Sequence, residues 1–287
     1  MEHSRTEPIT SVIAYIESHL AQKLDLDTVA SAVHYSKYHL HRLFTQTLGI
    51  TPHDYIQRRQ LTQAAELLVF SRKPILEIAL IAGYESQQAF TGVFKSMYKQ
   101  TPMEYRERQV FYPLQLRFTL RGEPSAPDIL VPGISFVTLE EIPRWMEFAA
   151  LVIGGFPCFD PAEHRERLRD YIHRKQALMA WDRETVIGAA AWSGQTGSID
   201  FLAVHPQYRH HQIGNALLDS ILPVMAGREI TITTFRVGDK ADTGQRAAYQ
   251  QLGFAEAELL TEFGYPVQRM RLSLARDSNL WKGGGSR

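Results

Sequence analysis

The sequence predicts two domains of different class, an all-α N-terminal domain and an α/β domain with a mixed sheet. Three observations support this prediction. The first 112 residues carry helical apolar periodicity and an internal repeat. After residue 133, strand and helix patterns alternate. Between them, the segment RGEPSAPDILVPG is rich in proline and glycine, which is typical of a linker.

We therefore divide the 287 residues into four parts. They are a helical domain over 1–112, a linker over 113–133, an α/β domain over 134–275 and a flexible tail over 276–287, whose GGGSR end is of the kind that cloning adds. Within the α/β domain we expect a closing hairpin, strands at 134–139, 177–181, 186–192, 199–204 and 230–235, and helices near 143–153, 163–175, 214–225 and 243–252.

The composition is that of a globular protein in a reducing compartment. Hydrophobic residues make up 44% and charged residues 22% of the chain, and the formal net charge is zero. Any nucleic-acid contact must therefore come from local placement of basic groups. The sequence shows no membrane span and no signal peptide, so we expect a cytoplasmic protein without a membrane partner. The single cysteine, Cys158, excludes an intrachain disulfide; it is a nucleophile or, as we favour, a small buried hydrophobe.

The helical half contains two copies of a helix, turn and helix pattern. VASAVHYSKYHLHRLF matches IALIAGYESQQAFTGVF at an offset of 49 residues, which rises to 50 after one insertion. The turn holds His34 in the first copy and Gly83 in the second, a position that suits left-handed backbone. Ser36 and Ser86 then stand as N-caps of the second helices. The amphipathic segment PHDYIQRRQLTQAAELLVF joins the two units as one long helix.

Exposed polar side chains on the second helix of each copy are the candidate DNA contacts. A helix-turn-helix unit lays this helix in the major groove, where arginine pairs with guanine and glutamine with adenine. The helix N-terminus favours a phosphate. The candidates are Ser36, Lys37, Tyr38, His41 and Arg42 in the first unit and Ser86, Gln87, Gln88 and Thr91 in the second.

Two other interpretations apply to this half. A helix-turn-helix can serve as a scaffold for protein contacts only. His39 and His41 suggest a metal site, but side chains two residues apart point to different sides of a helix, so we expect no metal.

The helical half resembles the DNA-binding domain of the AraC/XylS family of bacterial regulators. The matching residues are YSKYHLHRLFTQTLGITPHDYIQRRQLTQAAELL and PILEIALIAGYESQQAFTGVFKSMYKQTPMEYR, about 95 residues in all. The resemblance implies seven helices, binding of one chain to an asymmetric site on double-stranded DNA, and RNA polymerase as a partner. Gly92 stands where the family often has a basic residue, so we expect the second unit to read its half-site weakly.

The segment SIDFLAVHPQYRHHQIGNALLDSIL predicts a strand, a loop and a helix. The strand ends at Val204, and Pro206 breaks it. Residues 209–215 then bring backbone N–H groups to the start of a helix, where they have no partner within the helix and favour a diphosphate. Gly214 permits a close approach of the backbone to that group.

Together with TGQRAAYQQLGFAEAE, this loop resembles the GNAT family of acyl-CoA-dependent N-acetyltransferases. The resemblance covers roughly residues 134–274 and implies that acetyl-CoA or coenzyme A lies in a split between two parallel strands. Gln212 stands where the family's first glycine usually lies, and the asparagine often found near the Gln245 position is missing, so acyl-CoA binding is expected while catalysis stays open. The implied coenzyme contacts are Leu202, Ala203 and Val204 for the pantetheine arm and Arg209, His210, His211, Gln212, Ile213, Gly214 and Asn215 for the diphosphate.

Acetyl transfer to an amine needs a base and a proton donor for the departing thiolate. A tyrosine at the Tyr249 position commonly serves as that donor in the family, and packing of Tyr249 on Phe254 is the alternative. Asp200 is a candidate base, and Glu140 and Glu141 are others; spacing marks none of them.

Three functions are therefore possible. The first, which we favour, is a transcription regulator whose second domain senses an acyl-CoA or an amine. The second is an active N-acetyltransferase that transfers acetyl from acetyl-CoA to a primary amine and regulates its own expression. In the third, the second domain mediates dimerisation only.

Overall fold

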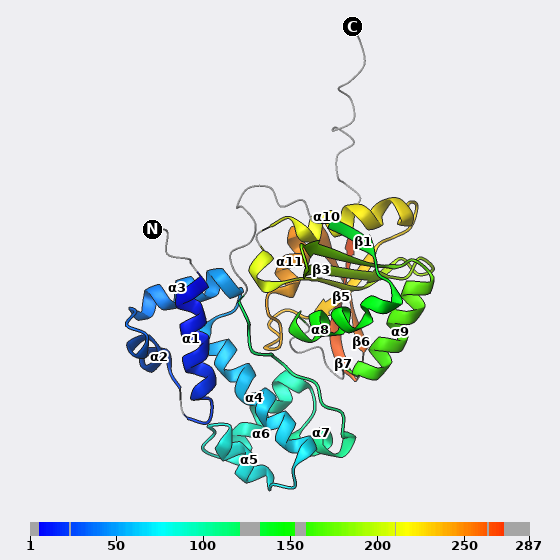
Figure 1. Ribbon diagram of the computed structural model, residues 1–287. Helices are drawn as coiled ribbons and strands as arrows, with labels where there is room; N and C mark the ends of the chain where they lie inside the picture. Colours follow the sequence, from blue (N-terminus) through cyan, green and yellow to red (C-terminus); the bar gives the residue numbers. More distant parts are fainter. Residues whose placement is uncertain are drawn as a thin grey trace, which may run out of the picture.

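The computed structural model describes residues 6–22, 24–120, 133–152, 159–209, 211–262 and 264–272. A helical domain is followed by a domain built on a seven-stranded sheet, which confirms the predicted fold class (Figure 1). The predicted linker residues from 121 to 132, Cys158, His210 and the tail over 276–287 lie outside the described residues. Every helix in the described part of the chain is too short or too polar to span a membrane.

Seven helices form the described part of the N-terminal half, in agreement with the resemblance. Both serine N-caps are present: Ser36 Oγ accepts a hydrogen bond from the amide of His39 at 3.3 Å, and Ser86 Oγ accepts one from the amide of Ala89 at 3.1 Å. The helices are α1 (Thr6–Ser18), α2 (Leu26–Ala32), α3 (Lys37–Leu48), α4 (Pro52–Phe70), α5 (Ile75–Ile81), α6 (Gln87–Tyr98) and α7 (Pro102–Arg108).

The repeat is visible in the backbone and in the core. The turn residues His34 and Gly83 have φ values of 58° and 80°, so both adopt the left-handed conformation that the sequence predicted. Each unit has its own cluster of buried apolar side chains, around Phe44 in the first and Phe94 in the second. The long helix α4 contributes its first turns to one cluster and its last turns to the other, so it is shared by the cores of both units.

The sheet of the second domain has the strand order β1-β2-β3-β4-β5-β7-β6. Only the pairing of β4 with β5 is parallel among the described strands, so the sheet is mixed, as predicted. The predicted closing hairpin is β6–β7. The strands are β1 (Gly133–Phe136), β2 (Ala177–Asp182), β3 (Thr185–Trp192), β4 (Ser198–Val204), β5 (Thr231–Phe235), β6 (Phe254–Glu262) and β7 (Tyr265–Leu272).

Helices cover both faces of this sheet. Alternate residues of a strand point to opposite faces, and Met179 of β2 packs in the cluster that contains α8 and α9, whereas Leu178 packs in the cluster that contains α10 and α11 (Figure 1). The elements are η1 (Leu139–Glu141), α8 (Ile142–Val152), α9 (Pro161–His173), η2 (Pro206–Tyr208), α10 (Ile213–Ile221), η3 (Leu222–Met225) and α11 (Gln245–Gln251).

The parallel strands β4 and β5 separate along their length. In the described chain their register pairs only Ser198 with Thr231 and Ile199 with Ile232. On its other side, β4 remains paired with β3 as far as Val204. The second half of β4 therefore has one edge free of strand pairing, which is where the sequence placed the pantetheine arm.

Residues 113–120, the described part of the predicted linker, pack against the helical domain. Leu114 is fully buried, and the amides of Leu114 and Gln115 donate hydrogen bonds to Thr62 Oγ1 of α4 at 3.1 Å and 3.2 Å. Phe118 stacks on Tyr55 of the same helix, with ring centroids 5.4 Å apart. This segment therefore extends the core of the helical domain before the chain leaves it.

The two domains are in direct contact through the loop that joins β5 to α11. Phe235 and Ala241 are buried in the apolar cluster of the second helix-turn-helix unit. Arg58, in the middle of α4, is 2% exposed and donates a hydrogen bond to the carbonyl oxygen of Ala241 at 2.9 Å. The core of the helical domain thus includes residues of the second domain.

Candidate functional site

The second helices of the two units present their polar side chains to solvent. Tyr38 is 87% exposed, so it has no packing role in the free protein. Thr91 is half-buried, unlike the other candidates. Lys37 Nζ donates to Asp27 Oδ2 at 2.6 Å, and this contact raises the pKa of Lys37, so the side chain is a cation that already has one carboxylate partner. The exposed candidates are Ser36, Lys37, Tyr38, His41, Arg42, Ser86, Gln87 and Gln88.

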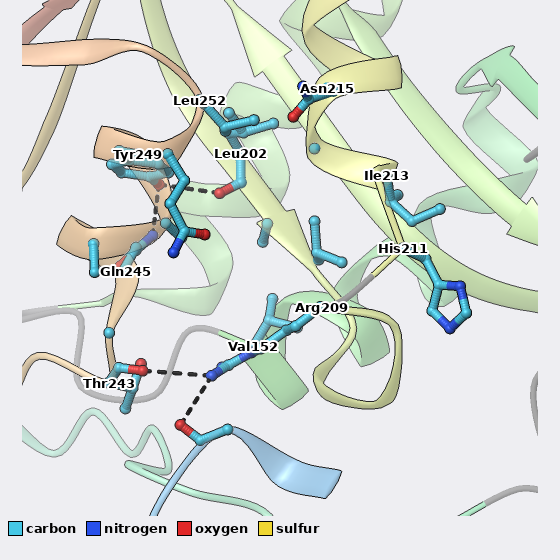
Figure 2. A pocket seen from close by; sticks show the side chains of 18 of the residues that line it. Val152, Leu202, Arg209, His211, Ile213, Asn215, Thr243, Gln245, Tyr249 and Leu252 are labelled. Atoms are coloured by element: carbon cyan, nitrogen blue, oxygen red, sulfur yellow. Dashed lines mark hydrogen bonds between the residues drawn. The ribbon is translucent and has the colours of Figure 1, made fainter. Parts of the chain in front are cut away.

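A cavity of about 650 Å³ lies in the second domain, between β4 and the first turns of α10 and α11 (Figure 2). Pockets of this volume are typical of binding sites for small molecules and cofactors. The structure brings together in this cavity every implied coenzyme contact that lies within the described residues. These are Leu202, Ala203, Val204, Arg209, His211, Gln212, Ile213, Gly214 and Asn215.

The helix α10 begins at this cavity with its N-terminal amides. The first N–H groups of a helix have no partner within it, and together with the helix dipole they favour an anion. Gly214 has a packing role here: a Cβ on it would meet the side chain of Leu252 at 3.3 Å. Gln212, which stands where the GNAT family usually has its first glycine, is the N-cap residue. It makes no side-chain capping hydrogen bond and lines the cavity.

Arg209 faces the cavity with two neutral partners. Its Nη1 donates to the carbonyl oxygens of Gly49, 3.3 Å away, and Thr243, 3.4 Å away (Figure 2). The side chain is accessible from the cavity, yet desolvation by the surrounding protein lowers the pKa of the guanidinium, and the charge of Asp242 opposes this shift. No ion pair of Arg209 is found among the described residues, so its charge is available to an anionic ligand.

Tyr249 lies at the free edge of β4. Its hydroxyl donates a hydrogen bond to the carbonyl oxygen of Leu202 at 3.0 Å and accepts one from Gln245 Nε2 at 2.6 Å (Figure 2). Burial raises the pKa of Tyr249, so the phenol keeps its proton and remains able to donate it. Its ring also contacts Phe254, with centroids 6.1 Å apart, as the alternative interpretation expected. The role of Tyr249 as general acid stays a prediction.

The candidate bases lie outside the cavity lining. Asp200 is exposed on β4 and accepts a hydrogen bond from the hydroxyl of Tyr171 at 2.5 Å. Glu141 accepts a hydrogen bond from the amide of Thr138 and so caps the short helix η1. Glu140 is exposed on the same helix. The geometry gives Glu141 a structural role, and Asp200 as base stays a prediction.

The sequence did not indicate three features of this region. Gly49, from the helical domain, lines the cavity. Thr243 lines it from the loop before α11. His164, on α9, accepts a hydrogen bond from Trp145 Nε1 at 3.0 Å, and burial lowers the pKa of His164 to about 4.

Comparisons with known proteins match each half separately. A model described as "Helix-turn-helix domain" matches residues 29–108, and one described as "Acetyltransferase (GNAT) domain" matches residues 153–274.

Among curated proteins, the transcriptional regulator Rob of Salmonella typhimurium is 40% identical over 136 residues, which cover 47% of this chain and 45% of Rob. The regulatory protein SoxS of Escherichia coli is 41% identical over 108 residues, which cover 38% of this chain and 99% of SoxS. The chain spans about half the length of the first curated relatives it matches.

Two solved structures are similar to parts of the chain. A transcriptional regulator of Chromobacterium violaceum, described as having an AraC-type DNA-binding domain, is 30% identical with a TM-score of 0.35, and the match covers 36% of this chain and 93% of that one. A GNAT-family acetyltransferase of Bacillus cereus is 11% identical with a TM-score of 0.39, and the match covers 49% of this chain and 96% of that one.

Proposed function

Because this chain belongs to the AraC-type helix-turn-helix regulators and carries a GNAT acetyltransferase domain, we propose that it is a bacterial transcription regulator controlled by acetyl-CoA or coenzyme A. In this proposal both helix-turn-helix units bind promoter DNA in the cytoplasm, where RNA polymerase is the partner. The observation that carries the coenzyme part is the cavity that joins the free edge of β4, the start of α10 and Arg209.

The DNA-binding part is supported by the geometry of the two units. The helix α4 has 19 residues, so it spans about 28 Å, comparable with the roughly 34 Å between successive major grooves on one DNA face. The candidate contacts of the first unit are exposed on α3 while the sheet domain is docked. The docked protein can therefore present this helix to DNA without first separating its domains.

The coenzyme part follows from the groups that face the cavity. The first-turn amides of α10 and the guanidinium of Arg209 would hold the diphosphate, and the free edge of β4 from Leu202 to Val204 would hold the pantetheine arm. When bound, acetyl-CoA supplies an activated thioester. Arg209→Ala should weaken the binding of coenzyme A to the full chain by about tenfold, because it removes a charge-assisted contact. Isothermal titration calorimetry measures this change, and an unaltered Kd would exclude Arg209 from the site.

A gel-shift titration tests the DNA part. The full chain should retard promoter fragments, and Arg42→Ala should lower the affinity and relax the sequence preference, because a base-reading arginine is lost. Failure to retard any fragment at low salt would contradict DNA binding by this chain.

A second candidate function, acetyl transfer to a primary amine, is favoured by the position of Tyr249. The phenol is protonated and lies at the edge of β4 where the thioester would be held. If Tyr249 protonates the thiolate, Tyr249→Phe should lower thiol release from acetyl-CoA at least tenfold and leave the Kd of coenzyme A nearly unchanged. Turnover equal to that of the wild type would remove Tyr249 from the mechanism.

A further inference from the structure

The second helix of each DNA-binding unit ends against the sheet domain. The helix α3 ends at Gly49, whose carbonyl oxygen accepts the hydrogen bond from Arg209. The helix α6 ends at Lys99, whose Nζ donates to Asp239 Oδ1 at 2.6 Å. Both C-cap residues have left-handed backbone, with φ values of 71° and 62°. The sheet domain therefore contacts the same end of both candidate recognition helices.

The contact at the second unit is strong and shielded. The side chains of Lys99 and Asp239 are only 14% and 3% exposed, so water screens their ion pair little. Two residues further along the chain, Ala241 is fully buried among apolar side chains and accepts the hydrogen bond from Arg58 of α4. The sheet domain is thus anchored to the second unit and to the middle of α4.

The contact at the first unit is weaker by comparison. A single cation, Arg209, donates to one neutral carbonyl oxygen of Gly49 at 3.3 Å, near the long end of hydrogen-bond distances. The approach is close because residue 49 is glycine: a Cβ there would lie 2.3 Å from Arg209 Nη1. Gly49 also lines the cavity. One guanidinium therefore lines the cavity and also donates a hydrogen bond to the C-cap residue of α3.

We propose that the phosphates of coenzyme A and the first helix-turn-helix unit compete for Arg209, so that a ligand in the cavity weakens DNA binding. The cavity is in this sense a composite site, with one lining residue, Gly49, supplied by the DNA-binding domain. This inference rests on the proposed function. It adds that coenzyme A lowers the affinity for DNA and that the contact between Arg209 and Gly49 transmits this effect.

The direction follows from the chemistry of the two acceptors. A phosphate carries a full negative charge and forms a hydrogen bond with arginine about twice as strong as one to a neutral carbonyl. When Arg209 turns to the phosphates, the carbonyl end of α3 loses a cation that complements its dipole. The first unit then loses this hydrogen bond to the sheet domain and keeps the apolar packing of Leu151 against its core, while Lys99 and Arg58 still hold the second unit and α4. The first unit is then held less firmly in its position relative to the second unit. Because both units must contact the DNA together, this loss of pre-organisation lowers the affinity for DNA.

The test measures the linkage in the full chain. A DNA duplex selected from a random pool by the ligand-free protein serves as the probe, and its Kd is measured by fluorescence anisotropy with and without saturating coenzyme A. We expect coenzyme A to raise the Kd for DNA about fivefold or more, and DNA to raise the Kd for coenzyme A by the same factor, because linkage between two sites is reciprocal.

A variant of the contact tests its role without removing the cation. Gly49→Ala displaces Arg209 from the carbonyl, so the variant should bind DNA as weakly as the coenzyme-bound wild type and should respond to coenzyme A less than twofold. Arg165→Ala removes an exposed arginine of α9 and is the matched control, which should keep the full response. Asp239→Asn weakens the anchor of the second unit and should lower DNA affinity while leaving the fold-change with coenzyme A intact.

Hydrogen exchange on the wild type avoids any folding defect of the variants. Coenzyme A should speed the exchange of the amide of Gly49, which donates to Thr45, and leave the amide of Lys99 at the end of α6 unchanged. If coenzyme A binds and DNA binds but neither Kd shifts, or if DNA affinity rises, the competition is wrong and the proposed function stands. If coenzyme A does not bind at millimolar concentration, the coenzyme part of the proposed function fails with it.

Discussion

His164 shows how a single half-buried side chain adds pH dependence to the sheet domain. It lies against Trp145 and Phe201, and its Nε2 accepts the hydrogen bond from the Trp145 indole. Burial is the main cause that lowers the pKa of His164 to about 4, and the positive charge of Arg167 contributes. The folded protein therefore keeps this histidine neutral at a pH where the unfolded chain protonates it.

This difference has a measurable consequence for stability. Because the folded pKa of His164, about 4, lies below the usual 6.5, the unfolded state binds the extra proton, and stability falls as the pH is lowered through this range. We expect a loss of about 2 kcal/mol from His164 between pH 7 and pH 5. In urea titrations His164→Gln should flatten this dependence, whereas His173→Gln, at an exposed site on the same helix, should keep the wild-type slope. Equal slopes for all three proteins would contradict the assignment.

At the scale of single residues, the sequence indicated candidate site residues where they belong to a local sequence pattern. The candidate coenzyme contacts Arg209 and 211–215 lie in one stretch that leads into a helix, so their place beside one another could be inferred from the chain itself. Gly49 could not be inferred, because its place in the cavity depends on how two domains pack. The local pattern explains Gly49 only as the left-handed C-cap of α3.

Among the elements, the caps and the strand alternation were predictable because their causes are local. Ser36 and Ser86 cap their helices through hydrogen bonds within three residues, and the strands follow the alternation of apolar side chains. The loop between β5 and α11 carries no such signal. Its buried residue, Ala241, packs on a helix that lies far away in the sequence. Irregular segments of this kind show no hydrophobic periodicity, so their tertiary contacts could not be predicted from the sequence.

Gly92 gives a prediction at the scale of one helix. It lies inside α6, and a Cβ added there would meet nothing within 4 Å, so packing does not require glycine. Gly92→Ala should stabilise the protein by about 1 kcal/mol, because alanine restricts the unfolded chain and favours the helix. Thermal or urea unfolding measures this gain, and a loss of stability would contradict the described environment of α6.

A charged residue at the same place tests the DNA-binding surface. Gly92→Lys should add one phosphate contact, so the affinity of the full chain for DNA should rise and its salt dependence should steepen by about one unit of log–log slope. Gly92→Ala is the matched control, since it gives a similar gain in helix stability without the charge. Identical DNA affinities for the two variants would place residue 92 away from the nucleic acid.

The whole molecule combines two domains that share contacts instead of being separated by a free linker. Arg58, Lys99 and Gly49 of the helical domain each contact the sheet domain. The sequence predicted both domains, but it placed a linker rich in proline and glycine between them and gave no sign of this packing. The reason is that domain docking is decided by surfaces assembled from distant parts of the chain.

The most direct measurement of the central claim is the melting temperature of the full chain with and without coenzyme A, with pantetheine as the control that lacks the diphosphate. A ligand that binds only the folded state at one hundred times its Kd stabilises it by about 2.7 kcal/mol, which corresponds to a rise of several degrees. We predict this rise with coenzyme A and a much smaller one with pantetheine. An unchanged melting temperature at millimolar coenzyme A, or an equal rise with both compounds, would contradict a site that binds the phosphates.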